Sequence, residues 1–468
     1  MIDWVDPWRG TADHGGPVTP SESHTPTIAA VATAPGVGAV SLIRVSGPQA
    51  VAIADRVTGG RASRAEPRQA VRCRILDAAG ATLDDGLMTV FRGPRSFTGE
   101  DAVEFAGHGG MLVTREVLSR FLACGAIPAG PGEFTQRAFF NGKLDLTQAE
   151  GVMDLISAQT SLALRAAREQ MEGTIGRRTI EARDEILGVL AHVEAYIDFP
   201  DEDIDPDTGR ALCDRLDRVS AAIDRLLATA DQGRILREGV RTVIFGEPNV
   251  GKSSLLNRLL GYERAIVSEI AGTTRDTIEE TVNLGGIPLR LIDTAGVRQA
   301  GDRIEEEGIR RTVRQIESAD LLLEVADAGL PRPLLRPADV PEDTRHLLIL
   351  NKADLGEHAD WSGIEAVRIS CQLDQGFDRL EAVIREALHL GSGEWGDHAV
   401  AINARHQACL ARARQSLAAA SAFLEPPADT ELAAIDLREA LDALGEVVGR
   451  VDTEDLLGVI FSSFCIGK

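Results

Sequence analysis

Cysteine is scarce in this 468-residue sequence: there are six, and no two form a CxxC pair. Such scattered cysteines indicate neither a disulfide framework nor a zinc site, so most are expected to be small buried hydrophobic residues. The sequence also lacks an apolar run long enough to span a bilayer, and its first residues lack the basic-then-apolar pattern of a signal peptide. We therefore expect a cytoplasmic protein that makes no membrane contact.

Basic residues are also fewer than acidic residues in this sequence. Lys and Arg total 49 against 72 Asp and Glu, which gives a formal net charge of -23. Affinity for a nucleic-acid backbone comes from Lys and Arg displacing counterions, so this balance excludes broad, non-specific nucleic-acid binding. Any RNA contact must be local or shared with a partner.

The chain is long enough for two or three domains, and its composition and hydrophobic pattern change along its length. Residues 1–24 are rich in Pro, Gly, Ser and Thr without periodicity, which predicts a flexible tail. In residues 25–140, short apolar runs alternate with Gly and Pro, as in an α+β domain. Strand-like sequence appears again in residues 239–394.

Two further segments read as helical, residues 141–238 and 395–468. In the first, apolar residues such as Ile186, Leu190 and Val193 recur at helical spacing. Because these segments flank the second strand-rich block, they predict one helical domain interrupted by an insertion.

The strongest chemical signal lies inside that insertion. GEPNVGKS, residues 246–253, fits G-x-x-x-x-G-K-[ST], follows an apolar strand and precedes the helical SLLNRLL. Glycines let the loop wrap tightly enough for backbone N–H groups to reach phosphates, Lys252 supplies charge at the outer phosphates, and Ser253 is the predicted Mg²⁺ ligand. The alternative, a Gly-rich turn before a helix, is disfavoured because strand, loop and helix occur in the right order.

Three later motifs complete a guanine-nucleotide site. DTAG, residues 293–296, ends an alternating strand and is expected near the metal and the terminal phosphate, while GTTRD supplies Thr274 as a second Mg²⁺ ligand. In NKAD, Asp354 can accept from both the ring N–H and the exocyclic amine of guanine, which adenine cannot satisfy. The motifs predict a GTPase and disfavour ATP. SCQ at residues 370–372 departs from the commoner Ser-Ala-Lys.

The residue that positions the attacking water is harder to identify from the sequence. The position after Gly296 holds Val297, which cannot orient water as a Gln would. Arginines between residues 298 and 311 offer an arginine finger, and the acidic run at residues 305–307 offers a carboxylate that positions water. Taken alone, each set is more typical of a solvated helix face.

Together, PNVGKSSLLN, GTTRD, DTAG, NKAD and the terminal FSSFCIGK resemble the MnmE (TrmE) family of tRNA-modification GTPases. SLIRVSG, SFTGEDAVEF, HGG, PGEFTQRAFFNGKLDLTQAE and DFPDEDI extend the resemblance over nearly the whole chain. These flanking segments separate the sequence from ribosome-assembly GTPases, which share the P-loop Asn and GTTRD. The resemblance implies an N-terminal folate-binding and dimerisation domain, a discontinuous helical domain, and an inserted Ras-like P-loop G domain.

The resemblance also implies a potassium-dependent mechanism. Hydrolysis in the family needs dimerisation of G domains and K⁺, whose ligands correspond here to Asn249, Ser268, Ile270 and Thr273; Ser268 replaces a Thr. The family's catalytic Glu corresponds to Glu305. From motifs and resemblance together, the predicted GTP-binding residues are Asn249, Val250, Gly251, Lys252, Ser253, Ser254, Ser268, Thr273, Thr274, Asp293, Thr294, Ala295, Gly296, Asn351, Lys352, Asp354 and Ser370.

A folate site carries over in the same way. The resemblance implies 5-formyl- or methylene-tetrahydrofolate bound by Arg44, Glu104, Lys143 and Lys468, where cations suit the folate carboxylates and a carboxylate suits the pterin amines. Cys465 resembles the family's functionally required C-terminal cysteine. Without the resemblance, these would be surface charges and a packed thiol.

The implied function is addition of a carboxymethylaminomethyl or aminomethyl group to C5 of the wobble uridine of tRNA. The implied assembly is a homodimer that joins the flavoprotein MnmG (GidA) as a heterotetramer, with GTP, GDP and tRNA as further partners. The resemblance implies that this partner supplies FAD. No Rossmann fingerprint is present in this sequence, so the chain itself is expected to bind neither FAD nor NADH. The rivals are a ribosome-assembly or signalling GTPase, disfavoured by the lack of an RNA-binding module, and a folate enzyme with a vestigial G domain, disfavoured by the intact motifs.

Overall fold

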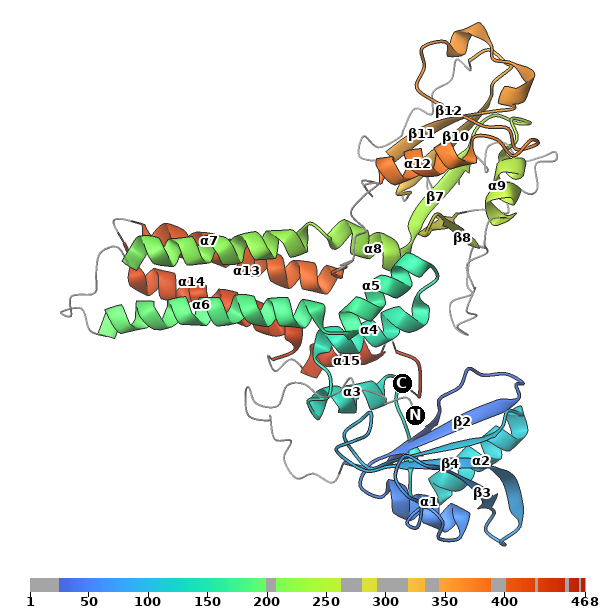
Figure 1. Ribbon diagram of the computed structural model, residues 1–468, viewed down its shortest axis with the longest axis vertical. Helices are drawn as coiled ribbons and strands as arrows, with labels where there is room; N and C mark the ends of the chain where they lie inside the picture. The colour runs from blue at the N-terminus through green and yellow to red at the C-terminus, as the bar shows by residue number, and fades with distance from the viewer. Residues whose placement is uncertain are drawn as a thin grey trace, which may run out of the picture. The chain divides into compact units, whose positions relative to one another are not determined.

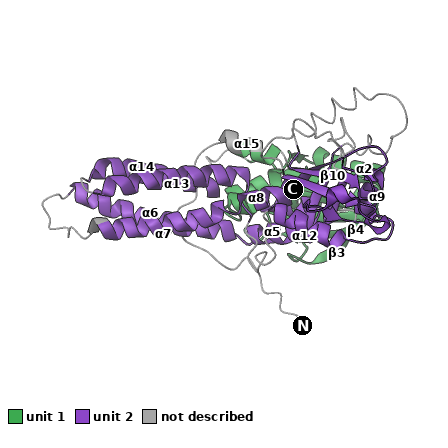
Figure 2. Ribbon diagram, turned by 90° about the horizontal axis from the view of Figure 1, so that it is seen from above, with its two compact units in different colours: residues 1–150, 449–468 green, residues 151–448 purple. Residues whose placement is uncertain are grey.

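The computed structural model describes residues 25–198, 208–261, 280–292, 319–332, 345–388, 401–425, 428–450, 454–462 and 464–467. The tail expected at residues 1–24 lies outside them. The chain divides into two compact units (Figure 2). The N-terminal unit comprises Met1–Glu150 with Gly449–Lys468, and the second unit comprises Gly151–Val448.

The N-terminal unit is built on a six-stranded sheet with the order β3-β4-β5-β2-β1-β6 (Figure 1). Along β2 the side chains alternate between buried and more exposed, as expected of a strand with one covered face. Helices α1 and α2 pack on the buried face. The described elements are β1 (Ile28–Val31), β2 (Val40–Ser46), α1 (Ala50–Thr58), β3 (Ala70–Leu76), β4 (Thr82–Phe91), β5 (Ala102–His108), α2 (Met111–Ala123), β6 (Ile127–Pro128), α3 (Glu133–Phe140), α4 (Leu146–Ser157), which continues into the second unit, and α15 (Glu454–Ser462).

The end of the chain returns to this unit. Ile466 forms an antiparallel bridge with Pro131, and the Phe461 ring lies 6.5 Å from the Phe139 ring, centroid to centroid. The sequence boundaries instead placed residues 141–150 and 449–468 in the helical domain. The grouping differs because aromatic contacts between distant segments leave no trace in a helical periodicity.

The second unit contains a bundle in which α6, α7, α13 and α14 lie side by side (Figures 1 and 2). Its single core takes residues from both helical segments, including Ile186, Leu190 and Val193, whose helical spacing is confirmed. Its described helices are α5 (Ser161–Met171), α6 (Thr174–Asp198), α7 (Thr208–Leu227), α8 (Ala230–Glu238), α13 (Ala404–Leu424) and α14 (Thr430–Val448).

The other part of the second unit is a six-stranded sheet with the order β12-β11-β10-β7-β9-β8. All neighbouring pairs are parallel except β8 with β9, and the strand order reverses at β7. In open parallel sheets, ligands bind at the carboxyl ends of the strands beside such a reversal. The described elements are β7 (Val240–Phe245), α9 (Lys252–Gly261), β8 (Glu280–Leu284), β9 (Ile287–Leu291), β10 (Leu321–Asp327), β11 (Arg345–Asn351), η1 (Ala353–Leu355), η2 (Ala359–Trp361), β12 (Val367–Arg368) and α12 (Phe377–Ala387).

The predicted combination of α/β and all-α parts is thereby confirmed. Among the described helices, none is both long and apolar enough to cross a bilayer.

Candidate nucleotide-binding site

The P-loop lies between β7 and α9, at the carboxyl end of the parallel strands. Gly246 has a φ of +145° and Gly251 a φ of +100°, conformations that L side chains rarely adopt. A Cβ at Gly246 would lie 2.1 Å from the carbonyl oxygen of Val325 in β10, and one at Gly251 would lie 2.1 Å from Nδ2 of Asn351. Both positions therefore require glycine, for backbone conformation and for close packing.

Lys252 turns its ammonium back across this loop. Its Nζ donates to the carbonyl oxygens of Gly246, at 2.9 Å, and Glu247, at 2.7 Å. Burial lowers the pKa of Lys252, and the nearby Glu247 carboxylate opposes that shift. A bound phosphate would favour the charged ammonium in the same way, so the loop and its lysine fit an anionic ligand.

Asn351, at the end of β11, connects the P-loop to the loop that carries SCQ, which is predicted to lie beside the guanine base. Its side chain is 2% exposed. Nδ2 donates to the carbonyl oxygen of Val250 at 3.0 Å, and Oδ1 accepts from the backbone N–H of Cys371 at 3.2 Å. One buried side chain thus joins the phosphate loop to the loop that carries SCQ.

Lys352 makes the second connection. Its Nζ donates to the Asn249 carbonyl oxygen at 3.0 Å and to Oδ2 of Asp327 at 2.6 Å. Asp327 ends β10, and the sequence motifs did not single it out. The available signal was its place directly after an apolar strand, where parallel strands deliver polar residues to one sheet edge.

The remaining described residues of the base loops differ in exposure. Asp354 is exposed in η1, and its carboxylate makes no hydrogen bond or ion pair with any described residue, which leaves both oxygens free to accept from a base. Ser370 is 2% exposed, and its Oγ accepts from the backbone N–H of Leu373 at 3.1 Å. The Ser370 side chain therefore shapes its own loop.

The structure brings together residues 249–254 with Asn351 and Lys352. Ser253 stands in the first turn of α9, where its hydroxyl is the hard oxygen ligand that Mg²⁺ prefers. The other predicted nucleotide, metal and catalytic residues lie outside the described residues: Ser268, Ile270, Thr273, Thr274, Asp293, Thr294, Ala295, Gly296 and Glu305.

In the N-terminal unit, two of the predicted folate residues are partners. Arg44 on β2 and Glu104 on β5 lie opposite each other in register, with Nε and Oε1 2.9 Å apart. The guanidinium carbon lies 5.6 Å from the ring centroids of both Phe97 and Phe134, and Nη1 donates to the Gly467 carbonyl oxygen at 3.4 Å. A cation, a carboxylate and a 37% exposed aromatic ring at Phe97 suit a flat heterocycle.

The other predicted folate residues are less engaged. Lys143 is half-buried and its Nζ donates to the Pro94 carbonyl oxygen at 3.2 Å, while Lys468 lies outside the described residues. The backbone carbonyl of Cys465 accepts from the Gly132 N–H at 3.3 Å, and its side chain is half-buried. The phenylalanines beside Arg44 were missed because ring contacts cannot be read from spacing.

Next to Arg44 on β2, Ser46 belongs to a buried polar cluster. Its Oγ donates to Glu100 at 2.7 Å, and Glu100 accepts in turn from Arg137 at 3.1 Å. Arg137 is almost fully buried and also pairs with Glu133 at 2.7 Å. Paired charges of this kind hold the surrounding backbone in place, because removing one partner would leave a buried charge uncompensated.

Among the described residues, the group suited by type to hold a metal is Asp84, Asp85 and His108, whose ligand atoms lie within 4.8 Å of one another. Its members already have partners. Oδ1 of Asp84 lies 2.6 Å from Nδ1 of His108, and Asp85 accepts from Arg72 at 2.6 Å. The geometry therefore describes an ion-paired cluster at the ends of β4 and β5.

Comparison with known proteins gives matches along nearly the whole chain. Residues 27–143 match the family described as GTP-binding protein TrmE N-terminus, and residues 146–465 match the MnmE helical domain family. A protein named tRNA modification GTPase MnmE from Akkermansia muciniphila is 55% identical over 444 residues, which are 94% of this chain and 99% of that protein. One of the same name from Natranaerobius thermophilus is 43% identical over 456 residues, with 94% and 99% covered.

A solved structure, the FeoB G-domain from Methanococcus jannaschii, is 28% identical with a TM-score of 0.24 and covers 32% of this chain and 98% of that chain.

Proposed function

Since the chain belongs to the MnmE family of tRNA modification GTPases, we propose that potassium-stimulated GTP hydrolysis drives its part in modifying the tRNA wobble uridine. It is a GTP hydrolase of tRNA modification. The reaction proposed is addition of a carboxymethylaminomethyl or aminomethyl group to C5. The observation that carries the nucleotide part is the joining of the P-loop to NKAD through Asn351 and Lys352.

Three described groups divide the work of nucleotide binding. The P-loop N–H groups and Lys252 hold the phosphates, because the tight glycine turns at 246 and 251 bring backbone donors close to the ligand. Asp354 accepts from guanine, and its carboxylate discriminates against adenine because adenine offers no matching pair of donors. Asn351 fixes the distance between these two halves of the site.

The metal ions are assigned to residues of the same loops. Mg²⁺ would be held by Ser253 and Thr274, and K⁺ by Asn249, Ser268, Ile270 and Thr273. A monovalent cation supplies positive charge beside the phosphates where other GTPases use an arginine finger. Glu305 is the proposed water-positioning residue, since Val297 cannot take that role. Thr294, Ala295 and Gly296, which belong to the DTAG motif, are proposed to bind near the terminal phosphate of GTP.

Folate and partners complete the proposal. A 5-formyl- or methylene-tetrahydrofolate is assigned to Arg44, Glu104, Lys143 and Lys468. Cys465, close to Lys468 in the chain, is proposed to be required for activity. The Arg44 and Glu104 pair between two phenylalanine rings supports this assignment. The protein is proposed to form a homodimer that binds MnmG, which contributes FAD and most tRNA contact. The net charge of -23 supports this division, because an acidic chain attracts RNA poorly on its own.

The decisive experiment is GTP turnover in potassium against sodium at equal ionic strength. We expect a large stimulation by potassium in the native protein and its loss in Asn249→Ala. Asn257→Ala is the matched control, because Asn257 is exposed on α9 and makes no described hydrogen bond. Equal turnover in both salts would overturn the potassium mechanism, and loss of stimulation in the control would show that the effect is not specific to Asn249.

A further inference from the structure

Helix α8 occupies the point where the chain passes from the helical part of the second unit into the nucleotide-binding sheet. It ends at Glu238, and β7, the strand that leads into the P-loop, begins at Val240. The single residue between them, Gly239, has a φ of +78°. Only one residue therefore separates β7 from α8.

The start of the sheet is fastened to α8 by one carboxylate. Asp320, just before β10, accepts from the backbone N–H of Arg241 at 2.9 Å and from its Nε at 3.2 Å. It also accepts from Arg234 of α8 at 3.2 Å. Burial works to raise the pKa of Asp320, but the hydrogen bonds from Arg241 outweigh it and lower the pKa. The charged carboxylate thus ties α8, β7 and β10 into one body.

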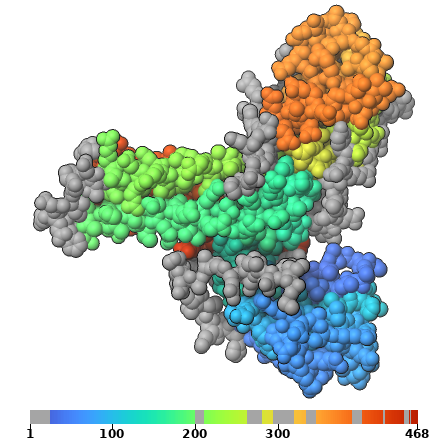
Figure 3. Space-filling view, in the orientation of Figure 1, coloured from blue at the N-terminus to red at the C-terminus, as the bar shows by residue number. Residues whose placement is uncertain are grey.

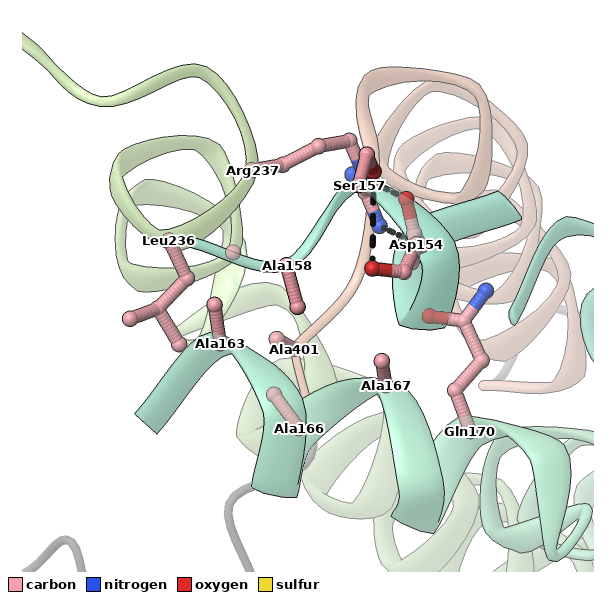
Figure 4. A pocket seen from close by; sticks show the side chains of 11 residues that line it. Asp154, Ser157, Ala158, Ala163, Ala166, Ala167, Gln170, Leu236, Arg237 and Ala401 are labelled. Carbon is pink, nitrogen blue, oxygen red and sulfur yellow. Dashed lines mark hydrogen bonds and ion pairs between the residues drawn. The ribbon is translucent and has the colours of Figure 1, made fainter. Parts of the chain in front are cut away.

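A second ion pair is formed by Arg237, three residues after Arg234 on α8. Arg237 donates through Nε to Oδ1 of Asp154 and through Nη2 to Oδ2, both at 2.7 Å (Figure 4). The side chains are 26% and 17% exposed, so the pair is largely shielded from water. Asp154 belongs to α4. This two-pronged pair is a polar link between α8, which precedes the P-loop strand, and α4.

Beside that pair the packing leaves a pocket (Figure 4). Apart from Asp154, Ser157, Gln170, Leu236 and Arg237, its walls are formed by side chains no larger than a methyl group: Ala158, Ala163, Ala166, Ala167, Gly233 and Ala401. Small side chains between helices permit sliding without steric conflict, which is the usual means by which packed helices shift.

The chain returning from the sheet meets α8 at the same place. A Cβ at Gly233 would lie 2.2 Å from the carbonyl oxygen of Ile402, so the two backbones are in direct contact. Ile402 is fully buried, and α13 begins at Ala404. Movement of α8 must therefore carry the returning segment, and through it the bundle, with it.

From these observations we propose that α8 transmits the nucleotide state of the P-loop to the helical part of the protein, with the Arg237–Asp154 pair as the joint. Coupling of this kind requires an element whose arrangement both sites bias. Here the sheet biases α8 through Asp320, and α4 biases it through Arg237. The inference rests on the proposed GTPase function, because its signal is the bound nucleotide.

The test is hydrogen–deuterium exchange on the full-length protein, without nucleotide and with GDP, aluminium fluoride and KCl. In the native chain we expect slower exchange in residues 246–254 and a changed exchange rate in residues 154–171. Arg237→Gln should keep the response of the P-loop and lose most of the response in 154–171. Asp154→Asn should do the same, which provides a second variant if the first is poorly folded.

Two further variants separate coupling from simple loosening. Asp224→Asn is the matched control, since Asp224 forms an ion pair with Arg414 at 3.0 Å within the bundle; both responses should persist. Exchanging the charges with Asp154→Arg and Arg237→Asp should restore part of the 154–171 response. If Arg237→Gln kept the full response in residues 154–171, the proposed coupling through α8 would be overturned. It would also be overturned if nucleotide protected the P-loop of the native chain without changing exchange in residues 154–171. Neither outcome would affect the GTPase proposal. If nucleotide did not slow exchange in the P-loop of the native chain, the GTPase proposal and the proposed coupling through α8 would both be overturned.

Discussion

Replacing Gly246 by Ala tests whether the P-loop geometry governs nucleotide binding. The added Cβ would lie 2.1 Å from the Val325 carbonyl oxygen and 3.1 Å from its carbonyl carbon, contacts with backbone atoms that cannot rotate away. Relief of this overlap requires a displacement on the order of 1 Å, and misplacement of that size costs roughly 100-fold in a positioned site. The φ of +145° adds strain of about 1–3 kcal/mol for a non-glycine residue.

We therefore expect Gly246→Ala to weaken GDP and GTP binding by at least roughly 100-fold, measured by titration with a fluorescent guanine nucleotide. Gly261→Ala is the control, because Gly261 ends α9 and a Cβ there would meet no atom of the described residues within 4 Å. Thermal unfolding of both variants would establish that the rest of the protein remains folded. Binding by Gly246→Ala within a few-fold of the native protein would refute the argument that close packing against β10 sets the loop.

Three further predictions concern single side chains. Asn351→Ala removes the partners of the buried Val250 carbonyl, a loss worth about 1–3 kcal/mol, and of the partly buried Cys371 N–H, so nucleotide affinity and thermal stability should fall; unchanged values would contradict its bridging role. The hydrogen bond to Asp84 raises the pKa of His108 above its ordinary 6.5, so the pair's stabilising effect is complete at acid pH and is lost as the pH rises through the raised pKa. NMR titration should show this pKa falling in Asp84→Asn, and an unaltered titration would refute the pairing. Glu104→Gln should weaken tetrahydrofolate binding, measured by calorimetry, by roughly 10-fold because a charge-assisted hydrogen bond is lost. Arg44→Lys should also weaken binding, because lysine has no planar guanidinium to place over the Phe97 ring. Wild-type affinity in both variants would exclude the site.

Local patterns in the sequence predicted the elements of the site. The strand–loop–helix order around residues 246–253 was readable because glycine, lysine and serine are each required by the chemistry of a phosphate loop. The helix containing Ile186 and Val193 was readable from spacing alone, since one buried face produces a period of 3.6 residues. The role of Asp327 could not be read in this way, because Asp327 belongs to none of the nucleotide-binding motifs.

The compact unit in which the last residues of the chain pack could not be read from the sequence. The helical texture of the last segment suggested that it belongs with the bundle, yet its final residues pack against the N-terminal unit through Phe461 and Ile466. Whether an apolar helix packs on one neighbour or another depends on shape, which composition does not encode.

Residue types and their local spacing were enough to predict the kind of chemistry, because phosphate binding and guanine selection each demand particular residues at fixed positions. How these pieces connect became visible only in the folded chain. The hydrogen bond from Asn351 to Val250 joins residues 101 positions apart, and the pair between Arg237 and Asp154 joins residues 83 apart. Such contacts depend on how strands and helices pack in three dimensions, and a side chain's partner across that distance leaves no periodicity in the chain.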